Sequence, residues 1–272
     1  FPGIELEVEP HRFYPHGSLA AHALGFTTKK QKLDHQEESE IRFNYPMAVD
    51  QGVSGLEFGF NGDLQGKEGA KAILVNNIGY RQSEETWIEP TPGKNLVLTL
   101  DLEVENSAEH ALAMSGPDTR GAIVVLNCRS GDIVAMASAP SYDLNMFVRP
   151  REYSQEEWDR LKDPILSPYY NRALQGAYPP GSIFKIVVAL AAFEAGVMGL
   201  DYKVYNPGYY MVGRRRIDDP NAPVGEWAFT EAFKRAANTY FIDVGLKAGA
   251  KKIIEMGSWL NLGDKTGMGE PK

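Results

Sequence analysis

The sequence has only one cysteine, no long apolar run and no excess of positive charge. Because Cys128 is alone, an internal disulfide framework is excluded. The longest uninterrupted apolar run, Ile186–Phe193, is far shorter than the roughly 20 residues that span a bilayer as a helix. Lysine and arginine number 28 against 36 aspartate and glutamate, and the net charge of −8 argues against a general nucleic-acid-binding protein.

Metal and cofactor motifs are also lacking. The chain has five histidines, and only His11 and His16 lie close together, in an expected loop. A metal site needs several ligands at suitable spacings, so we predict no metal and no cofactor. No signal peptide is recognisable and the chain opens on Phe1. We therefore expect a piece of a longer protein, with any membrane anchor outside this sequence.

The residues that are present are typical of a folded globular protein, with 43% hydrophobic and 24% charged residues. A chain of 272 residues is long enough for two domains. Pro90, Pro92 and Gly93 form a linker-like segment. We therefore expect an N-terminal domain over residues 1–93 and a second domain over residues 94–272.

Apolar periodicity predicts both helices and strands in the second domain. Residues 95–101 alternate as a strand does, and residues 103–114 have the spacing of an amphipathic helix. That helix places four apolar side chains on one side: Val104, Ala108, Ala111 and Leu112. The β-rich runs 121–127 and 132–138 predict a hairpin with Gly131 in its turn. We therefore predict an α+β fold with an antiparallel sheet flanked by helices.

The remaining segments have simpler signatures. In chain order we expect a strand in the opening residues (Ile4, Leu6, Val8), a polar loop at 27–40, turns at 52–69, a helix at 154–162 opened by a Ser154–Glu157 capping box, a loop at 207–223 and an amphipathic helix at 230–250.

The stretch Tyr178–Gly196, YPPGSIFKIVVALAAFEAG, carries the strongest chemical signal. Residues 183–195 predict a helix that is apolar on nearly every side and therefore lies in a core. Burial and the nearby helix N-terminus both disfavour a charged Lys185, so we expect its pKa to be lowered. One helical turn places this amine beside Ser182. A neutral amine beside a hydroxyl is a general base beside a nucleophile.

Ser182-x-x-Lys185 is the first element of the active-serine, penicillin-recognising signature. Its surroundings make the match specific, because further segments resemble the same family in the same order: FPGIELEVEPHRFYPHGSLAAHALGF, GVSGLEFGFNGDLQGKEG, GAIVVLNCRSGDIVAMASAPSYDLNMF, NRALQG, YPPGSIFK and ANTYFIDVGLKAG. The chain resembles the class B penicillin-binding proteins, and among them the cell-elongation type.

This resemblance implies a peptidoglycan DD-transpeptidase with a non-catalytic, dimerisation-like pedestal at its N-terminus. Ser182 would attack the D-Ala carbonyl of a stem peptide, Lys185 would take its proton, and Asn238 would hydrogen-bond both the substrate amide and Lys185. Penicillins and other β-lactams would acylate the same serine. The resemblance further implies the periplasmic face of the bacterial inner membrane. Through the pedestal, it implies a membrane glycosyltransferase and morphogenesis proteins as partners.

Two positions depart from the family pattern. The second motif is S-x-N in the family, and Ala236 stands here where its serine is expected. Ala236 lacks the hydroxyl that would relay a proton, and such acid–base contributions are typically about 10²–10⁴-fold. A literal K-T-G occurs at Lys265–Gly267, in a glycine-studded turn segment rather than a strand. We expect it to be a decoy for the third motif, which would then follow residue 272.

Three alternatives remain open at this point. A β-lactamase or DD-carboxypeptidase would share the Ser182 motif but would need an activated water. A pseudoenzyme scaffold of the wall-synthesis machinery would fit Ala236. As a purely structural alternative, Ser182 could be a helix N-cap.

The charged run Arg214–Arg216, with Asp218 and Asp219, is read as a solvated loop with self-neutralising charges.

Overall fold

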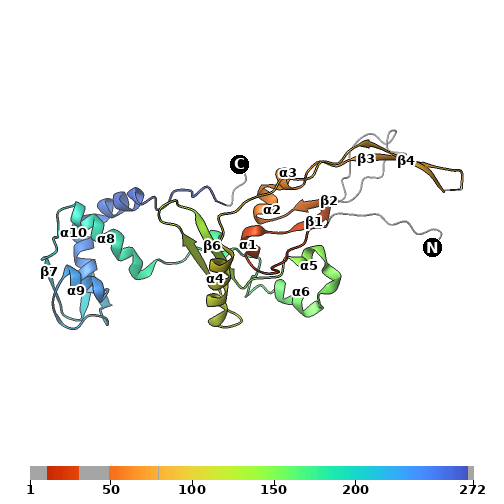
Figure 1. Cartoon of the computed structure of the whole chain (residues 1–272). Coiled ribbons are helices and arrows are strands. Elements are labelled where there is room, and N and C mark those ends of the chain that lie inside the picture. Colours follow the sequence, from red (N-terminus) through yellow and green to blue (C-terminus); the bar gives the residue numbers. More distant parts are fainter. Residues whose placement is uncertain (1–10, 31–48, 79, 269–272) are drawn as a thin grey trace. The chain divides into compact units, whose positions relative to one another are not determined.

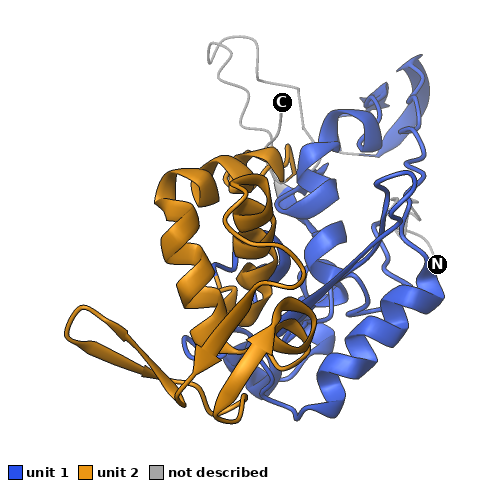
Figure 2. Cartoon of the chain, turned by 90° about the vertical axis from the view of Figure 1, so that its left-hand side faces the viewer, with its two compact units in different colours: residues 1–177, 269–272 blue, residues 178–268 orange. Residues whose placement is uncertain are grey.

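The computed structural model describes residues 11–30, 49–78 and 80–268. Contacts divide the chain into two compact units, one running to Ala177 and the other over Tyr178–Met268 (Figure 2). Each unit has apolar clusters of its own. The boundary near residue 93 stays a prediction, since the contacts group the chain at a different place.

The first unit combines short helices with pairs of antiparallel strands (Figure 1). Among its described residues the helices are α1 (Ala21–Leu24), α2 (Gly55–Gly59), α3 (Asn61–Leu64), α4 (Leu102–Met114), α5 (Asn145–Val148), the 3₁₀ turn η2 (Pro150–Glu152), α6 (Gln155–Leu161) and α7 (Arg172–Gln175). The strands pair as β1 (Thr27–Lys30) with β2 (Val49–Gly52), β3 (Ala70–Val75) with β4 (Arg81–Ile88), and β5 (Gly121–Leu126) with β6 (Ile133–Ala139).

Helix α4 confirms the amphipathic helix predicted there. Asp101 begins it, because its carboxylate accepts the backbone N–H groups of the second and third helical residues at 2.9 and 3.0 Å. Its buried stripe runs along Glu105, Ala108 and Leu112, which lie three and four residues apart. The placement of Ala111 on the inner face was wrong: it is exposed, because it lies beside this stripe rather than on it.

The strands β5 and β6 confirm the predicted hairpin, with Gly131 at a positive φ of 81° in its turn. Strand β6 supplies the surface on which α4 packs, through the fully buried Ala135 and Ala137. The strand predicted at residues 95–101 does not form. Asp101 N–H donates to Val134 O in β6, but no ladder of consecutive pairs follows, and Val97 is exposed.

An aromatic cluster forms another core of the first unit. Phe26 stacks on Phe147 with ring centroids 3.5 Å apart, and Tyr142 meets Phe147 edge-on. Trp158 of α6 completes the cluster, and α6 confirms the predicted helix, including both hydrogen bonds of the capping box at Ser154.

Near the N-terminus, two predictions are wrong and one cannot be compared. The polar segment predicted as a loop at 27–40 begins instead with strand β1, whose first residue, Thr27, is buried. The strand expected at residues 4–8 lies outside the described residues. Segment 52–69, predicted to be rich in turns, instead carries the two short helices α2 and α3, with a single turn residue, Phe60, between them.

The second unit is built on two helices that pack against each other, α8 (Lys185–Glu194) and α10 (Asn238–Trp259). Among its described residues the other elements are the 3₁₀ turn η3 (Gly181–Phe184), the strands β7 (Lys203–Asn206), β8 (Tyr209–Val212), β9 (Arg215–Asp218) and β10 (Gly225–Ala228), and helix α9 (Phe229–Lys234). Strand β7 pairs with β10, and β8 with β9, all antiparallel. The α+β class with antiparallel pairing is thus confirmed, although the sheets are small.

Helix α8 is less buried than predicted. Val187 and Ala191 face inward, but Ile183 in η3 and Ile186 and Leu190 in α8 are 74%, 46% and 40% exposed. An apolar side chain permits burial but does not supply a partner, and α8 is covered by α10 along one side. The expectation of burial on every side was therefore wrong.

The segment predicted as a loop at 207–223 contains the hairpin β8–β9 instead. Val212 pairs with Arg215 across a two-residue turn whose first residue, Gly213, has a φ of 59°. A glycine with positive φ is what such a tight turn needs, so the signal was present in the sequence. The three arginines run from this turn into β9, and Arg216 pairs with Asp218 at 2.8 Å.

The helix predicted at 230–250 is two helices, with a break at residues 235–237. Helix α9 ends in a Schellman motif: Ala237 N–H donates to Ala232 O at 2.9 Å and Ala236 N–H to Phe233 O at 3.0 Å. Ala236 takes the left-handed position of this motif, with φ of 50°. Glycine is the usual residue there, and its absence hid the break from sequence analysis.

Candidate active site

Ser182 lies in the 3₁₀ turn η3, directly before α8, and its side chain is exposed. Gly181, with φ of 57°, turns the chain from the two prolines into this element. The alternative role of Ser182 as an N-cap is wrong, because Pro180 holds the N-cap position of η3 and Phe184 that of α8. The hydroxyl is therefore not used to satisfy the start of a helix.

Lys185 is the first residue of α8, one turn after Ser182, as its spacing predicted. Its Nζ lies 3.2 Å from Ser182 Oγ. The side chain is half-buried, and this burial lowers the pKa of Lys185, while the negative charge of Asp219 acts in the opposite direction. The predicted direction of the pKa shift is thus confirmed, and the opposing carboxylate is new.

Asn238 is brought to the same amine from the first residue of α10. Its Oδ1 accepts a hydrogen bond from Lys185 Nζ at 2.8 Å. Its Nδ2 donates to the backbone carbonyl of Asp218 at 3.1 Å, so both ends of the amide are fixed. A contact between Asn238 and Lys185 was expected from the sequence, and the structure has it.

Ala236 contributes its backbone instead of a side chain. The left-handed turn at this residue directs its carbonyl oxygen to Lys185 Nζ, which donates a hydrogen bond to it. A non-glycine residue in this conformation costs on the order of 1–3 kcal/mol, and such residues gather at functional sites. Without a side-chain hydroxyl at position 236, the oxygen partners of Lys185 Nζ are these three: Ser182 Oγ, Ala236 O and Asn238 Oδ1.

Asp219 was misread in the sequence as part of a solvated loop. Asp218 is exposed and pairs with Arg216 as expected, but the neighbouring Asp219 is only 4% exposed. Its Oδ2 accepts the backbone N–H of Thr239, the residue after Asn238, at 2.8 Å. Adjacent charges look alike in a sequence, and only the path of the chain after β9 buries one of them.

The other sequence candidates lie apart from this cluster or remain open. Lys265–Gly267 lies outside any strand, as its turn-like sequence predicted, and its exclusion as the third motif stays a prediction. Cys128 is exposed in the turn between β5 and β6. In the described ranges, no group of three or more His, Cys, Asp and Glu residues is arranged to hold a metal ion.

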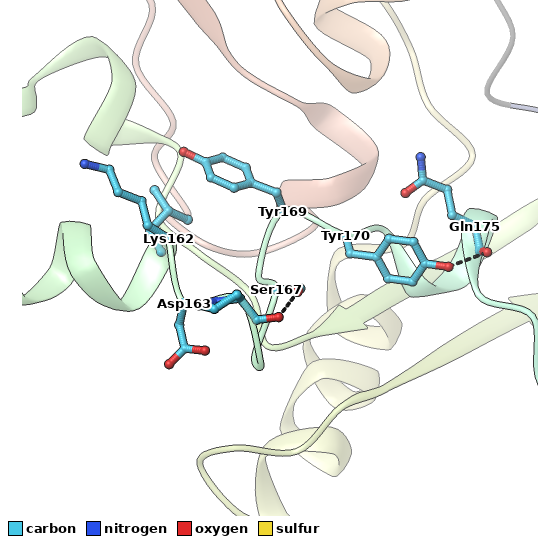
Figure 3. A pocket seen from close by; sticks show the side chains of 8 residues that line it. Lys162, Asp163, Ser167, Tyr169, Tyr170 and Gln175 are labelled. Atoms are coloured by element: carbon cyan, nitrogen blue, oxygen red, sulfur yellow. Dashed lines mark hydrogen bonds between the residues drawn. The ribbon is translucent and has the colours of Figure 1, made fainter.

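A pocket of about 400 Å³ lies in the first unit, lined by residues between α6 and α7 (Figure 3). Two hydroxyl groups of its lining already donate hydrogen bonds to nearby backbone carbonyls: Ser167 Oγ to Pro164 O and the Tyr170 hydroxyl to Gln175 O. No charged pair or nucleophile–base contact is formed there between its lining residues. The chemistry therefore lies with the cluster around Lys185 in the second unit.

Comparison with known families gives two domain matches. Residues 1–98 match the penicillin-binding protein dimerisation domain, and residues 121–272 match the penicillin-binding protein transpeptidase domain. A relative from Escherichia coli (strain K12), peptidoglycan D,D-transpeptidase MrdA, is 32% identical over 98% of this chain and 42% of its own length. The Haemophilus influenzae protein of the same name is 32% identical over 98% of this chain and 41% of its own length.

Solved structures give the same result. The chain is similar to the penicillin-binding protein PBP2 of Helicobacter pylori in complex with MreC, with a TM-score of 0.73 and 30% identity over 94% of this chain and 46% of that one. It is also similar to Pseudomonas aeruginosa PBP2 in complex with WCK 5153, with a TM-score of 0.71 and 32% identity over 94% of this chain and 51% of that one. The chain spans less than half the length of the two curated relatives above. Because the transpeptidase domain alone accounts for more than half of the 272 residues, the chain belongs to the transpeptidase family of penicillin-binding proteins.

Proposed function

We propose that this chain supplies the nucleophile, the base and a substrate-binding amide of a peptidoglycan DD-transpeptidase of the cell-elongation type. The observation that carries the proposal is the convergence of Ser182, Ala236 and Asn238 on one amine, Lys185 Nζ. Relatives named peptidoglycan D,D-transpeptidase, matched over nearly the whole chain, support the same activity.

The three partners of Lys185 differ in what they can do with a proton. The Ala236 carbonyl and Asn238 Oδ1 can only accept hydrogen bonds, whereas the Ser182 hydroxyl can donate one. A neutral lysine keeps two N–H groups, which match the two pure acceptors, and its lone pair is then left for the Ser182 O–H. The lowered pKa of Lys185 favours this neutral form. The arrangement therefore directs proton transfer from Ser182 to Lys185.

The reaction follows from this proton transfer. As the Ser182 proton moves to Lys185, Ser182 Oγ forms a bond to the D-Ala carbonyl carbon, and the C–N bond to the terminal D-Ala breaks. The departing amine takes the proton that Lys185 has received, and the acyl group stays on Ser182. An amine of a neighbouring stem then attacks the acyl carbon and gives up a proton to Lys185, the bond from this carbon to Ser182 Oγ breaks, and Ser182 Oγ regains a proton from Lys185. In a β-lactam the C–N bond that breaks belongs to the ring, so the leaving group stays attached. The Ser182 backbone N–H would contribute to the oxyanion hole.

A catalytically impaired member of the family is the second candidate, and Ala236 is the observation that favours it. The residue places only a carbonyl and a methyl group where a hydroxyl would relay the proton to the leaving group. Such a protein would still be acylated at Ser182 but would turn over slowly. A measurable acylation without cross-linking activity distinguishes this candidate from an active transpeptidase.

The domain organisation and partners follow by likeness. We infer a pedestal over residues 1–93 and a transpeptidase domain over residues 94–272, close to the two matched domains. Similar structures are a PBP2 with MreC and a peptidoglycan synthase complex that coordinates polymerisation and crosslinking. They support a morphogenesis protein and a membrane glycosyltransferase as partners. The periplasmic face of the cell envelope is inferred from the family resemblance alone. In the part of the chain that the structure describes, no helix is both long and apolar enough to cross a bilayer.

Incubation of the full-length protein with a fluorescent penicillin tests the proposal. We expect one adduct, which mass spectrometry of the digested protein assigns to Ser182. Ser182→Ala should abolish it, whereas Ser154→Ala, which removes an exposed capping hydroxyl from α6, should leave it in place. Absence of labelling in a protein with a cooperative thermal transition, or an adduct on another residue, would refute the proposal.

A further inference from the structure

The carboxylate of Asp219 is the most deeply buried charged group at the site. The backbone N–H of Asp219 donates to Gly208 O at 2.9 Å, and Asp219 Oδ2 accepts the backbone N–H of Thr239 at 2.8 Å. Its second oxygen, Oδ1, is buried and has no hydrogen-bond partner among the described residues. A buried carboxylate oxygen without a donor is rare, because its desolvation is not compensated, and it calls for an explanation.

We propose that Asp219 is a positioning residue for the Ser182 site: it fixes the N-terminus of α10, which carries Asn238, and it supplies a buried negative charge to the surroundings of Lys185. No motif in the sequence assigns this role to Asp219. Its catalytic meaning rests on the proposed acyl-transfer function, whereas the effect of its charge on Lys185 is measurable without that function.

The positioning follows from contacts around the start of α10. Helix α10 has no side-chain cap from the residue before it, and Asp219 supplies one from 20 residues away by accepting the Thr239 N–H. The preceding residue, Asp218, holds Asn238 Nδ2 through its carbonyl. Asn206 of β7 adds a third contact, because its Oδ1 accepts a hydrogen bond from Thr239 Oγ1 at 2.9 Å. The loop after β9 therefore holds both residues that begin α10.

The electrostatic role follows from the surrounding charges. Burial lowers the pKa of Lys185, and the Asp219 charge is the one that opposes this effect. The other carboxylates on the adjoining segments are engaged elsewhere: Asp218 with Arg216, and Asp243 with Lys247. The ring of Phe241, 5.7 Å from Lys185 Nζ, adds a weak attraction for the cation. The charge of Asp219 thus limits how far burial lowers the pKa of Lys185.

A limit of this kind suits the proposed chemistry. A general base works best when its pKa lies near the working pH, because it must both take and return a proton. Lys185 has to accept the Ser182 proton and then release it toward the leaving amine. Since Ala236 carries no hydroxyl to share this transfer, Lys185 has to make both proton transfers itself.

The test uses Asp219→Asn in the full-length protein. Asparagine is nearly the same size, and its Oδ1 can still accept the Thr239 N–H, so the start of α10 is kept while the charge is removed. The probe is trace acetic anhydride, which acetylates an amine only in its neutral form. The labelling rate of Lys185, followed by mass spectrometry from neutral to alkaline pH, gives its titration midpoint. We expect this midpoint to move to lower pH in Asp219→Asn.

Two controls separate charge from structure. Glu231→Gln removes an exposed carboxylate from α9, where it pairs with Lys234, and should leave the midpoint unchanged. Asp219→Glu keeps the charge and should keep the midpoint near that of the unaltered protein, even if the longer side chain disturbs the cap. An unchanged midpoint in Asp219→Asn, with the thermal transition preserved, would overturn the proposal.

Penicillin acylation provides the link to function. If the proposal holds and Ser182 is acylated, the rate of acylation by penicillin falls toward acid pH as Lys185 becomes protonated. In Asp219→Asn this fall should move to lower pH together with the labelling midpoint. A moved labelling midpoint in a protein that never reacts with penicillin would refute the proposed function and leave the coupling of Asp219 to Lys185 standing. An acid limb that stays in place while the midpoint moves would refute Lys185 as the base.

Discussion

Among the described residues, each unit buries one carboxylate that has one oxygen hydrogen-bonded and the other without a partner, and the two carboxylates differ in the charges that surround them. In the first unit, Glu105 Oε2 accepts the N–H of Met136 at 2.7 Å, while Oε1 is buried without a partner. In the second unit, Asp219 Oδ2 accepts the N–H of Thr239 at 2.8 Å, and Oδ1 is likewise unpartnered. Both side chains are less than 5% exposed.

The neighbouring charges decide what each carboxylate does. Burial raises the pKa of Glu105, and one turn further along α4 burial also raises the pKa of Glu109 to about 7, with the Glu105 charge adding to this shift. Two acids in one seam therefore favour taking up protons. Asp219 instead acts on a cation, Lys185, and changes its tendency to lose a proton. The same hydrogen-bond pattern is structural in one unit and serves the candidate active site in the other.

Removal of the cation tests this difference most strongly. Lys185→Met removes the proposed base while keeping most of the apolar stem, and we expect the rate of penicillin acylation to fall about 10²–10⁴-fold. Glu105→Gln, the matched change in the first unit, should leave the acylation rate unchanged. Stopped-flow measurement with a fluorescent penicillin gives both rates. Equal effects of the two variants would mean that the units do not differ in function as argued.

The missing hydroxyl gives the second test, which sharpens the account of the second unit. Ala236→Ser restores a proton relay beside Lys185, so we expect faster acylation, toward the lower end of the roughly 10²–10⁴-fold range of acid–base effects. Ala236→Gly is the control, because it relieves the positive φ without adding a hydroxyl. If the two variants react at the same rate, the gain comes from the backbone and the relay argument fails.

The smallest expected effect concerns the acid pair of the first unit. The pKa of Glu109 rises from 4.5 to about 7 on folding, so the folded state prefers the protonated acid and its stability falls as the pH increases through this window. Glu109→Gln removes this dependence and can still accept the Ala20 N–H, which lies 2.7 Å from Glu109 Oε1. Allowing for partial exposure, we expect about 1 kcal/mol of added stability above the window and none below it.

Urea unfolding at two pH values measures the effect of Glu109→Gln. The control is Glu156→Gln, which removes an exposed carboxylate from α6 and should change stability equally little at both values. A stabilisation by Glu109→Gln that does not depend on pH would show that folding does not raise the pKa of Glu109. The contrast with Asp219 would then be unfounded.

Sequence reasoning succeeded where the signal is local. The hairpin β5–β6, helices α4 and α6, and the Ser182–Lys185 pair were all predicted, because periodicity, caps and one-turn spacing act over a few residues. It failed where a partner decides the outcome. Residues 95–101 alternate like a strand but find no ladder, and the apolar surface of α8 is exposed where α10 does not reach.

The candidate site divides in the same way. By itself, the sequence pointed to Ser182 and Lys185 as the proposed nucleophile and base and to Asn238 as the proposed substrate-binding residue, because the first two lie one helical turn apart and the third stands in a recognisable motif. Only the tertiary structure decided that Ala236 contributes its carbonyl through a left-handed turn, and that Asp219 is buried while Asp218 is exposed. Burial and charge coupling depend on which distant segments meet, and the path of the chain after β9 brings an anion to the start of α10 and to Lys185.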